Sequence, residues 1–211
     1  MEKVKIHIEK RIFDIVFSLS AIILFSPFAI FLLIAMALEG IFTPPSRGSF
    51  FYTETRISEG EPFIMYKFRI FKKSVLEKEL KEKKFIHTKP LEQDKNNLTY
   101  IGRFLKSVYM DESAQLYNVL RGDMSLVGPR PTNTENSKQL YKDGKYSRFL
   151  IRAGITGYFQ SQKGSEKKLE QEAVDMEYVN FCRGNPGWKV VLLDLRIIYM
   201  TIKTVFRAEG V

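Results

Sequence analysis

One uncharged stretch near the N-terminus constrains this chain more than any other feature. Residues 15–38 (IVFSLSAIILFSPFAIFLLIAMAL) contain 24 positions without a charged side chain. A helix rises about 1.5 Å per residue, so this stretch is long enough to cover a hydrocarbon core of about 30 Å. The sequence therefore predicts a membrane helix, attached to a remainder that is long enough, in a chain of 211 residues, for one further domain.

The membrane stretch is interrupted near its middle by Ser26 and Pro27. Proline removes a helical hydrogen bond, and a nearby serine can partly satisfy the freed backbone, so we expect a kink. Either a bent spanning helix or a re-entrant hairpin would result. Because both flanks carry Lys and Arg without marked asymmetry, the pattern favours the re-entrant form. A cleaved signal peptide is a third reading, although the apolar run exceeds the usual h-region of about 7 to 15 residues.

The positive charge belongs to the part after this stretch. Residues 1–40 hold as many acidic as basic side chains, so the formal net charge of +9 lies in residues 41–211. We therefore divide the chain into a membrane part, 1–40, and a domain at the cytoplasmic face, 41–211. A cationic domain beside a membrane suits anionic lipids or phosphorylated substrates, and less readily nucleic acid. The lone Cys182 excludes an internal disulfide and fits a buried hydrophobe.

The expected fold is a small α+β domain with more helix than strand. Residues 62–71 (PFIMYKFRIF) and 124–127 indicate strands of one short sheet, and 75–85 indicate a charged helix. A further helix is expected from Asp111 to about Arg121. No phosphate-binding loop, nucleophile elbow or zinc-ligand spacing occurs in the sequence. Any catalysis must therefore rest on carboxylates and cations.

Asp111 and Glu112 are the first candidates for such chemistry. Acidic residues are common in the first turn of a helix simply because they complement its dipole. The same position would keep a carboxylate ionised, as a nucleophile or a metal ligand requires. Lys67 and Arg69 would share one face of their strand, where a solvated surface is the ordinary explanation.

A rigid turn follows the 124–127 strand. In Gly128-Pro129-Arg130-Pro131 the two prolines restrict the backbone and so limit where the arginine can point. A guanidinium held in this way suits a phosphate group. Carboxylates and a pinned cation beside a membrane suggest metal-assisted phosphoryl chemistry on a lipid-linked substrate.

With these residues in view, the chain resembles the bacterial sugar transferase family, the monotopic phosphoglycosyl transferases. The resemblance covers most of the chain, and the run from Asn118 to Pro131 is its most specific part. The other matching features are the Ser-Pro break, KFR at 67–69, IGRFLK at 101–106, the Asp-Glu pair, GITGYFQ at 154–160 and WKVVLLDLRIIYMTIKT at 188–204.

The resemblance implies an enzyme that transfers a phosphosugar from a UDP-sugar to polyprenyl (undecaprenyl) phosphate at the cytoplasmic face of the inner membrane, which starts glycoconjugate or polysaccharide synthesis. It implies Asp111 as a nucleophile that forms a covalent phosphosugar intermediate, with Mg²⁺ held by Asp111 and Glu112. The implied phosphate-binding residues are Lys67, Arg69, Arg103, Lys106, Pro129, Arg130, Pro131 and Lys163.

The sequence also departs from the family pattern around the pair. Tyr109-Met110 precede Asp111 where the family usually has Ser-Leu, and Lys106 replaces a usual arginine. The alternative function is therefore a membrane-attached binding or scaffold protein with a decayed transferase site. Basic residues recur along 188–207 on an otherwise apolar helix, which suits either a helix lying in the membrane interface or an ordinary core helix.

Overall fold

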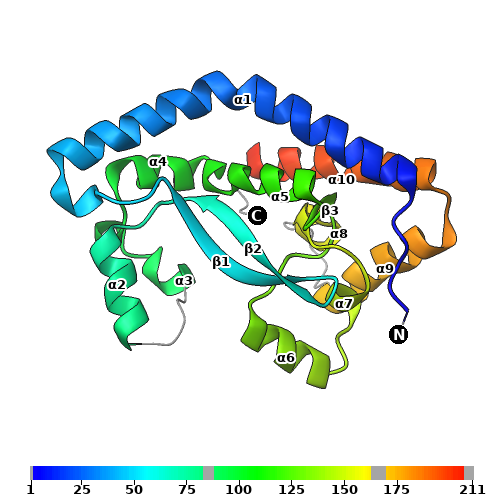
Figure 1. Ribbon diagram of the computed structural model, residues 1–211. Helices are drawn as coiled ribbons and strands as arrows, with labels where there is room; N and C mark the ends of the chain where they lie inside the picture. The colour runs from blue at the N-terminus through cyan, green and yellow to red at the C-terminus, as the bar shows by residue number, and fades with distance from the viewer. Residues whose placement is uncertain (1, 83–87, 163–169, 207–211) are drawn as a thin grey trace. The chain divides into compact units, whose positions relative to one another are not determined.

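The computed structural model describes residues 2–82, 88–162 and 170–206, and its elements are labelled in Figure 1. The chain forms two compact units. The first comprises residues 1–21, 54–65 and 115–211, and the second comprises residues 22–53 and 66–114. Each unit has its own hydrophobic core. The helix-rich α+β fold expected from the sequence is confirmed.

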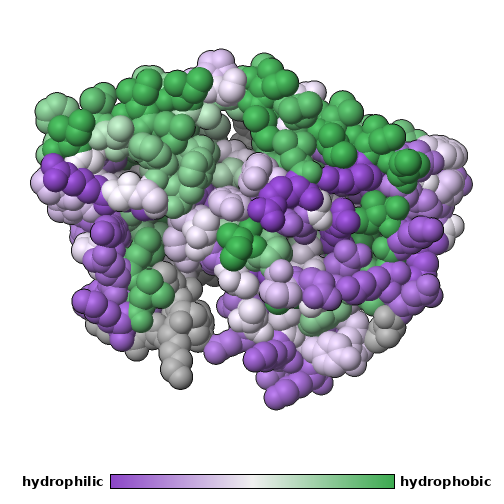
Figure 2. Space-filling view, viewed as in Figure 1, coloured by the Kyte–Doolittle hydropathy of each residue, from purple (hydrophilic) through white to green (hydrophobic). Residues whose placement is uncertain are grey.

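Helix α1 (Ile8–Phe42) contains the uncharged stretch. Within the described residues it is the one helix that is long and apolar enough to cross a membrane, and only 11% of its most apolar window is buried. A core helix of a soluble protein would bury most of that window. Figure 2 shows the apolar side chains as a band along α1. This exposure indicates association with a membrane.

The Ser26-Pro27 break lies inside α1, and the structure shows how the backbone carbonyl left by the proline is hydrogen-bonded. Pro27 has no N–H to donate to the carbonyl oxygen of Ile23, four residues earlier. The hydroxyl of Ser26 donates a hydrogen bond of 2.8 Å to that same oxygen. The serine therefore replaces the donor that the proline removes, as the sequence suggested. The choice between a re-entrant and a spanning helix stays a prediction.

A hairpin follows α1. Strands β1 (Phe51–Ser58) and β2 (Glu61–Phe68) pair with each other, and both residues of the turn between them, Glu59 and Gly60, have positive φ. Two such residues match the twist of a two-residue hairpin. Figure 1 shows the pair as a long twisted ribbon. The expected strand at 62–71 is present but ends at Phe68.

The core of the first unit is built around a second small sheet. Strand β3 (Ser125–Val127) pairs in parallel with β4 (Gly154–Thr156), with Ser125 opposite Gly154 and Val127 opposite Thr156. The strand at 124–127 is thus confirmed, but the expectation of one sheet is wrong. β3 pairs with β4, a strand that sequence reasoning missed because three residues carry too little periodicity, and β2 pairs with β1.

Helices surround β3 and β4 in this unit. Helix α5 (Gln115–Arg121) packs on β3 and ends at Gly122, whose φ of 90° terminates the helix as expected. Helix α10 (Gly187–Phe206) packs on both strands, and α9 (Gln171–Gly184) packs on its neighbouring helices. The remaining helices of the unit are α6 (Thr134–Lys142), α7 (Ser147–Leu150) and α8 (Tyr158–Ser161).

The second unit places the end of β2 against α4 (Tyr100–Ser107). Its core contains Leu32, Met36, Phe71, Leu98 and Leu105. Helix α2 (Lys73–Glu82) accounts for the expected charged helix up to residue 82, and residues 83–85 lie outside the described residues. The short elements of the unit are η1 (Pro44–Ser46), α3 (Thr88–Leu91), η2 (Lys95–Asn97) and η3 (Met110–Ala114).

Candidate functional site

The Asp-Glu pair is positioned by α4, whose N-terminus is unusually well anchored. Thr99 accepts a hydrogen bond from the N–H of Gly102. The carboxylate of Glu39, at the far end of α1, accepts from the N–H groups of Tyr100 at 2.7 Å and Ile101 at 3.1 Å. Three of the amide groups that a helix start leaves unsatisfied are thus paired. Sequence reasoning missed Glu39, although a single carboxylate at the end of an apolar helix was a visible signal.

Gly102 lets α4 approach the chain beyond β2. A Cβ atom built at Gly102 would lie only 2.2 Å from the carbonyl oxygen of Ile70. Any side chain would therefore push α4 away from this segment. The glycine of the IGRFLK stretch is explained by this contact, which fixes the helix that leads to Asp111.

Asp111 and Glu112 themselves lie in the 3-10 helix η3, not in the first turn of an α-helix. The expected helix from Asp111 to Arg121 is divided into η3 and α5. Between α4 and η3 the chain turns at Tyr109, which has a φ of 56°. A bulky residue in this left-handed region is strained. The strain lies two residues before Asp111, at the position where the sequence departs from its family.

The carboxyl group of Asp111 is a weaker acid than an exposed aspartate. Its pKa is raised from 3.8 to about 6, mainly by burial and also by the charges on Glu112 and Glu92, while Lys67 acts to lower it. The sequence predicted a fully ionised carboxylate at a helix start, and the burial of this site was not visible in the pattern. Strongly shifted carboxyl groups are common where chemistry occurs.

Two lysines lie beside these acids. The Nζ atom of Lys67 is 3.2 Å from Oε1 of Glu112, and both side chains are mostly buried. The Nζ atom of Lys106 contacts Glu92, with 2.7 Å to its carbonyl oxygen and 3.2 Å to its carboxylate. The structure thus brings Lys67 together with the Asp-Glu pair. Lys106 contacts Glu92, whose charge acts on Asp111.

The group of acids fits a magnesium ion in its chemistry. Mg²⁺ prefers hard oxygen ligands and is usually held by one or two carboxylates together with water and substrate phosphates. Asp111 and Glu112 supply two adjacent carboxylates, and their repulsion, which helps to raise the pKa of Asp111, would be relieved by a divalent cation. No cluster of three or more potential metal ligands occurs within residues 2–82, 88–162 and 170–206.

Arg69 and Arg103 lie in different surroundings from those expected. The buried guanidinium of Arg69 donates to three backbone carbonyl groups, those of Ser46, Ser49 and Phe71, at 2.6 to 2.8 Å. It ties the segment after α1 to the end of β2, so these bonds give Arg69 a structural role, and its assignment as a phosphate ligand stays a prediction. Arg103 donates to the carbonyl oxygen of Lys95 and stacks over Tyr100.

The Gly128–Pro131 turn belongs to the first unit and is held against β4. Gly128 donates to the carbonyl oxygen of Thr156 at 2.9 Å, and Gly154 donates to that of Pro129 at 3.0 Å. A Cβ atom on Gly128 or Gly154 would lie within 2.2 Å of the opposite backbone. Glycines therefore permit the close pairing that fixes the start of the turn, and Gly128 and Pro129 are buried.

Arg130 emerges from this turn as a half-buried side chain. A second arginine, Arg148, lies near it. Burial lowers the pKa of Arg148, the carboxylates of Asp175 and Glu172 raise it, and the charge of Arg130 lowers it. The cationic neighbourhood expected around Arg130 thus includes a residue that sequence reasoning did not single out. Lys163 lies outside the described residues.

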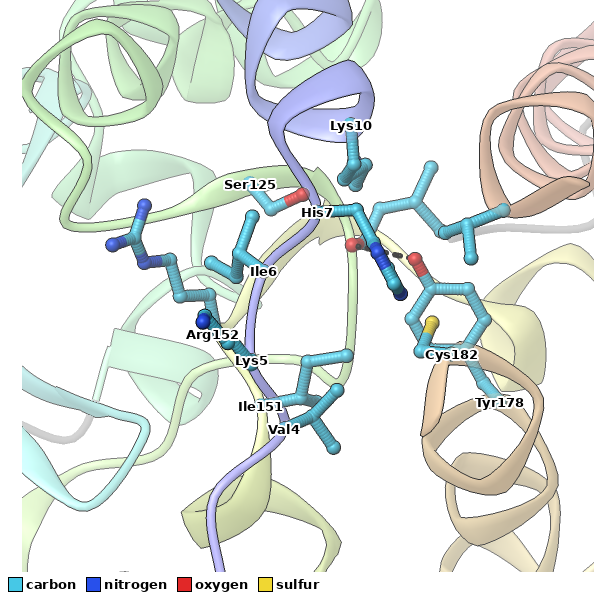
Figure 3. A pocket seen from close by; sticks show the side chains of 12 residues that line it. Val4, Lys5, Ile6, His7, Lys10, Ser125, Ile151, Arg152, Tyr178 and Cys182 are labelled. Atoms are coloured by element: carbon cyan, nitrogen blue, oxygen red, sulfur yellow. Dashed lines mark hydrogen bonds between the residues drawn. The ribbon is translucent and has the colours of Figure 1, made fainter. Parts of the chain in front are cut away.

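A buried charge network lies elsewhere in the first unit, and Figure 3 shows two of its members, Lys10 and Tyr178. The Nζ atom of Lys10 contacts Asp14 at 2.6 Å and Asp194 at 2.7 Å. Tyr178 donates to Asp194 at 2.8 Å. All four side chains are almost fully buried. Cys182 lies beside them, and burial raises its pKa to about 12, so it is an inert thiol as the sequence indicated.

Comparison with known proteins places the chain in a family. Residues 5–208 match the family model described as bacterial sugar transferase. The UDP-glucose:undecaprenyl-phosphate glucose-1-phosphate transferase of Klebsiella pneumoniae is 34% identical over 92% of this chain and 39% of its own length. The undecaprenyl-phosphate galactose phosphotransferase of Salmonella typhimurium is 32% identical over 95% of this chain and 41% of its own length.

A shorter relative matches over most of its own length. The exopolysaccharide production protein ExoY of Sinorhizobium fredii is 33% identical over 96% of this chain and 88% of its own length. The chain thus spans about two fifths of the first two relatives and most of the third. Since the family model matches nearly every residue, the chain belongs to the bacterial sugar transferase family.

Proposed function

We propose that this protein transfers a phosphosugar from a UDP-sugar to undecaprenyl phosphate at the cytoplasmic face of the inner membrane. The observation that carries the proposal is the partly buried Asp111, with its pKa raised to about 6 beside Glu112 and Lys67. Relatives named for UDP-glucose and undecaprenyl phosphate support the classes of donor and acceptor. The proposed product would start the synthesis of a polysaccharide or glycoconjugate.

The proposed reaction has two displacements at one phosphorus atom. An Asp111 oxygen attacks the phosphorus that bears the sugar, and the bond to the bridging oxygen breaks, so that UMP leaves with the electron pair. A phosphate oxygen of undecaprenyl phosphate then attacks the same phosphorus and releases the Asp111 carboxylate. The covalent intermediate divides one difficult step into two. A pKa near 6 leaves most of the carboxyl group ionised at neutral pH and more basic than an ordinary aspartate.

An anionic nucleophile approaches an anionic diphosphate only if the charge on the phosphate oxygens is balanced. Lys67 is assigned this role because its ammonium group already lies beside the pair. Arg130, limited by its prolines, is assigned to a phosphate of the donor or of the lipid. Mg²⁺ bound by Asp111 and Glu112 would supply further positive charge. Glu112 would hold the metal, and its contact with Lys67 keeps that cation beside Asp111 as Asp111 attacks.

Membrane placement rests on the exposed apolar faces of two helices. α1 exposes large apolar side chains along its length, and α10 exposes Trp188, Leu192, Leu195, Tyr199 and Ile202. The α10 residues recur at spacings of three and four, so they form one stripe beside Lys189, Arg196 and Lys203. This favours an interfacial helix over the core-helix reading, with the uncharged stretch of residues 1–40 in the membrane and 41–211 at its surface.

The test is UMP release in detergent from a panel of UDP-sugars with undecaprenyl phosphate and Mg²⁺. Asp111→Asn is the test variant, and Asp143→Asn, at the exposed end of α6, is its matched control. We expect release by the parent and the control only. A radiolabelled phosphosugar should stay attached to the parent when the lipid is omitted. A folded parent that binds UDP-sugar without turnover would instead support the decayed-site alternative.

A further inference from the structure

The peptide groups immediately before the Gly128–Pro131 turn are held by the buried network at the base of the membrane helix. Oδ1 of Asp14 accepts a hydrogen bond of 3.3 Å from the N–H of Leu126. The hydroxyl of Tyr178, bonded to Asp194, lies 3.3 Å from the carbonyl oxygen of Val127. The hydroxyl has one proton, which it shares between Asp194 and Val127. Asp14 therefore bonds β3 directly, and Asp194 holds the Tyr178 hydroxyl in contact with the next residue of β3.

Lys10 joins these two aspartates. Its Nζ atom lies 2.6 Å from one carboxylate and 2.7 Å from the other, and its side chain is 8% exposed. Without that cation, two carboxylates would face each other in a site that excludes water, and each would carry a large desolvation cost. Burial already raises the pKa of Asp194 while Lys10 lowers it. The lysine thus holds both acceptors in place through its two contacts.

The first turns of α1 also hold the helix that leads into β3. The guanidinium of Arg11 donates to the carbonyl oxygens of Val119 and Leu120 at 2.6 and 2.7 Å. These groups lie in the last turn of α5, where carbonyls have no helical partner. Residues 10–14 therefore restrain the chain on both sides of Gly122.

We propose that Lys10 is a positioning residue for Arg130: through Asp14, Asp194 and Tyr178 it fixes β3, and β3 fixes the turn from which Arg130 emerges. The inference rests on the proposed function in that Arg130 is assigned there to a phosphate. Val127 is three residues from Arg130, with Pro129 between them and Pro131 immediately after, so the backbone on both sides of Arg130 is restricted. A small displacement at β3 therefore reaches the guanidinium.

A role beyond stability follows from the chemistry of the network. Well-packed apolar side chains often replace a buried ion cluster without loss of stability, so stability alone does not require the charges. Apolar residues cannot supply directional hydrogen bonds to the peptide groups of Leu126 and Val127. A cavity of about 20 Å³ adjoins Lys10, Ser125 and Tyr178 (Figure 3), which leaves space for a larger cation. Lys10→Arg is therefore the conservative variant that should preserve the geometry.

The first arm of the test does not depend on turnover. Amide hydrogen exchange is measured on the full chain in detergent for the parent, Lys10→Met and Lys10→Arg. In Lys10→Met we expect exchange about tenfold faster in residues 124–131 than in the parent, with α6 unchanged. Lys10→Arg should match the parent. Equal acceleration in α6 and in residues 124–131, or no change in either, would overturn the positioning role.

The second arm is a double-mutant cycle on UMP release. Lys10→Met should lower kcat/KM about tenfold in the parent but less than about twofold in the Arg130→Ala background, because its effect passes through Arg130. An equal loss in both backgrounds would show that Lys10 acts independently of Arg130. Failure of the proposed function is recognised separately, since Asp111→Asn would then release as much UMP as the parent.

Discussion

Two carboxylates, the fully buried Asp194 in one unit and the partly buried Asp111 in the other, are weaker acids than usual, and desolvation is the main cause in both. Their neighbours differ. The carboxylate of Asp194 contacts the ammonium group of Lys10 and accepts a hydrogen bond from Tyr178. At Asp111 the negative charges of Glu112 and Glu92 also raise the pKa. At Asp194 the cation contacts the carboxylate itself. At Asp111 the two lysines contact its acidic neighbours, Glu112 and Glu92, so the carboxyl group keeps a raised pKa that a cationic cofactor would lower.

The largest expected effect separates these two regions. Asp111→Asn should lower UMP release at least about 10³-fold and leave the free energy of unfolding at or above that of the parent, since a nucleophile is lost and a desolvated charge is removed. Asp194→Ala should cost about 3 to 5 kcal/mol, because Lys10 keeps only Asp14. Urea unfolding and UMP release measure both. If Asp111→Asn were less stable than Asp194→Ala, the proposed difference between the two carboxylates would be wrong.

The pKa of Asp111 gives the second prediction. Because its folded-state pKa is raised, Asp111 contributes stability that is fully present below pH 3.8 and is lost as the pH rises through about 6. At pH 7.5, Asp111→Asn should therefore exceed the parent by about 1 to 2 kcal/mol, with no advantage near pH 3.5. UMP release by the parent should rise with pH and reach half its maximum below pH 6, because Mg²⁺ would favour the ionised carboxylate. A pH-independent difference in stability would contradict the buried carboxylate.

The KFR stretch at 67–69 also contains one residue expected to matter for stability, Arg69, and one expected to matter for turnover, Lys67. Arg69→Lys cannot make all three bonds to backbone carbonyls and should cost about 1 to 3 kcal/mol of stability. Lys67→Met should leave stability within about 0.5 kcal/mol and lower kcat/KM about 10²-fold, because the cation at the Asp-Glu pair is lost. Thermal unfolding and turnover distinguish the two. A stable, slow Arg69→Lys would support the phosphate-binding interpretation.

The smallest effect concerns Tyr109. Asparagine adopts positive φ more readily than tyrosine, so Tyr109→Asn should raise stability by about 0.5 to 1 kcal/mol. Tyr100→Asn, an exposed tyrosine with helical backbone on α4, is the control and should gain nothing. Equal changes in the two variants would mean that the backbone at Tyr109 stores no strain.

Long or chemically distinctive segments could be predicted from the sequence. Periodicity and composition identified α1, the strand before the Gly128–Pro131 turn and the end of α5 at Gly122. Other features depend on partners distant in the sequence. The guanidinium of Arg69 reaches its backbone carbonyl partners only in the folded chain. Glu39 accepts a hydrogen bond from a helix start 61 residues away. Lys10 forms an ion pair with Asp194, near the C-terminus. A single sequence determines such long-range pairs, but no local pattern in it reveals which residues will pair.

The pairing of Ser26 with the carbonyl oxygen of Ile23 makes the order of substitutions matter. While Pro27 is present, losing the serine hydroxyl leaves that oxygen without a donor in an apolar surrounding, where an unsatisfied group costs several kcal/mol. Once Pro27 is replaced, the new backbone N–H can donate to the carbonyl oxygen of Ile23, and the Ser26 hydroxyl is no longer needed. A lineage can therefore lose the proline first and the serine later, whereas the reverse order passes through a destabilised helix.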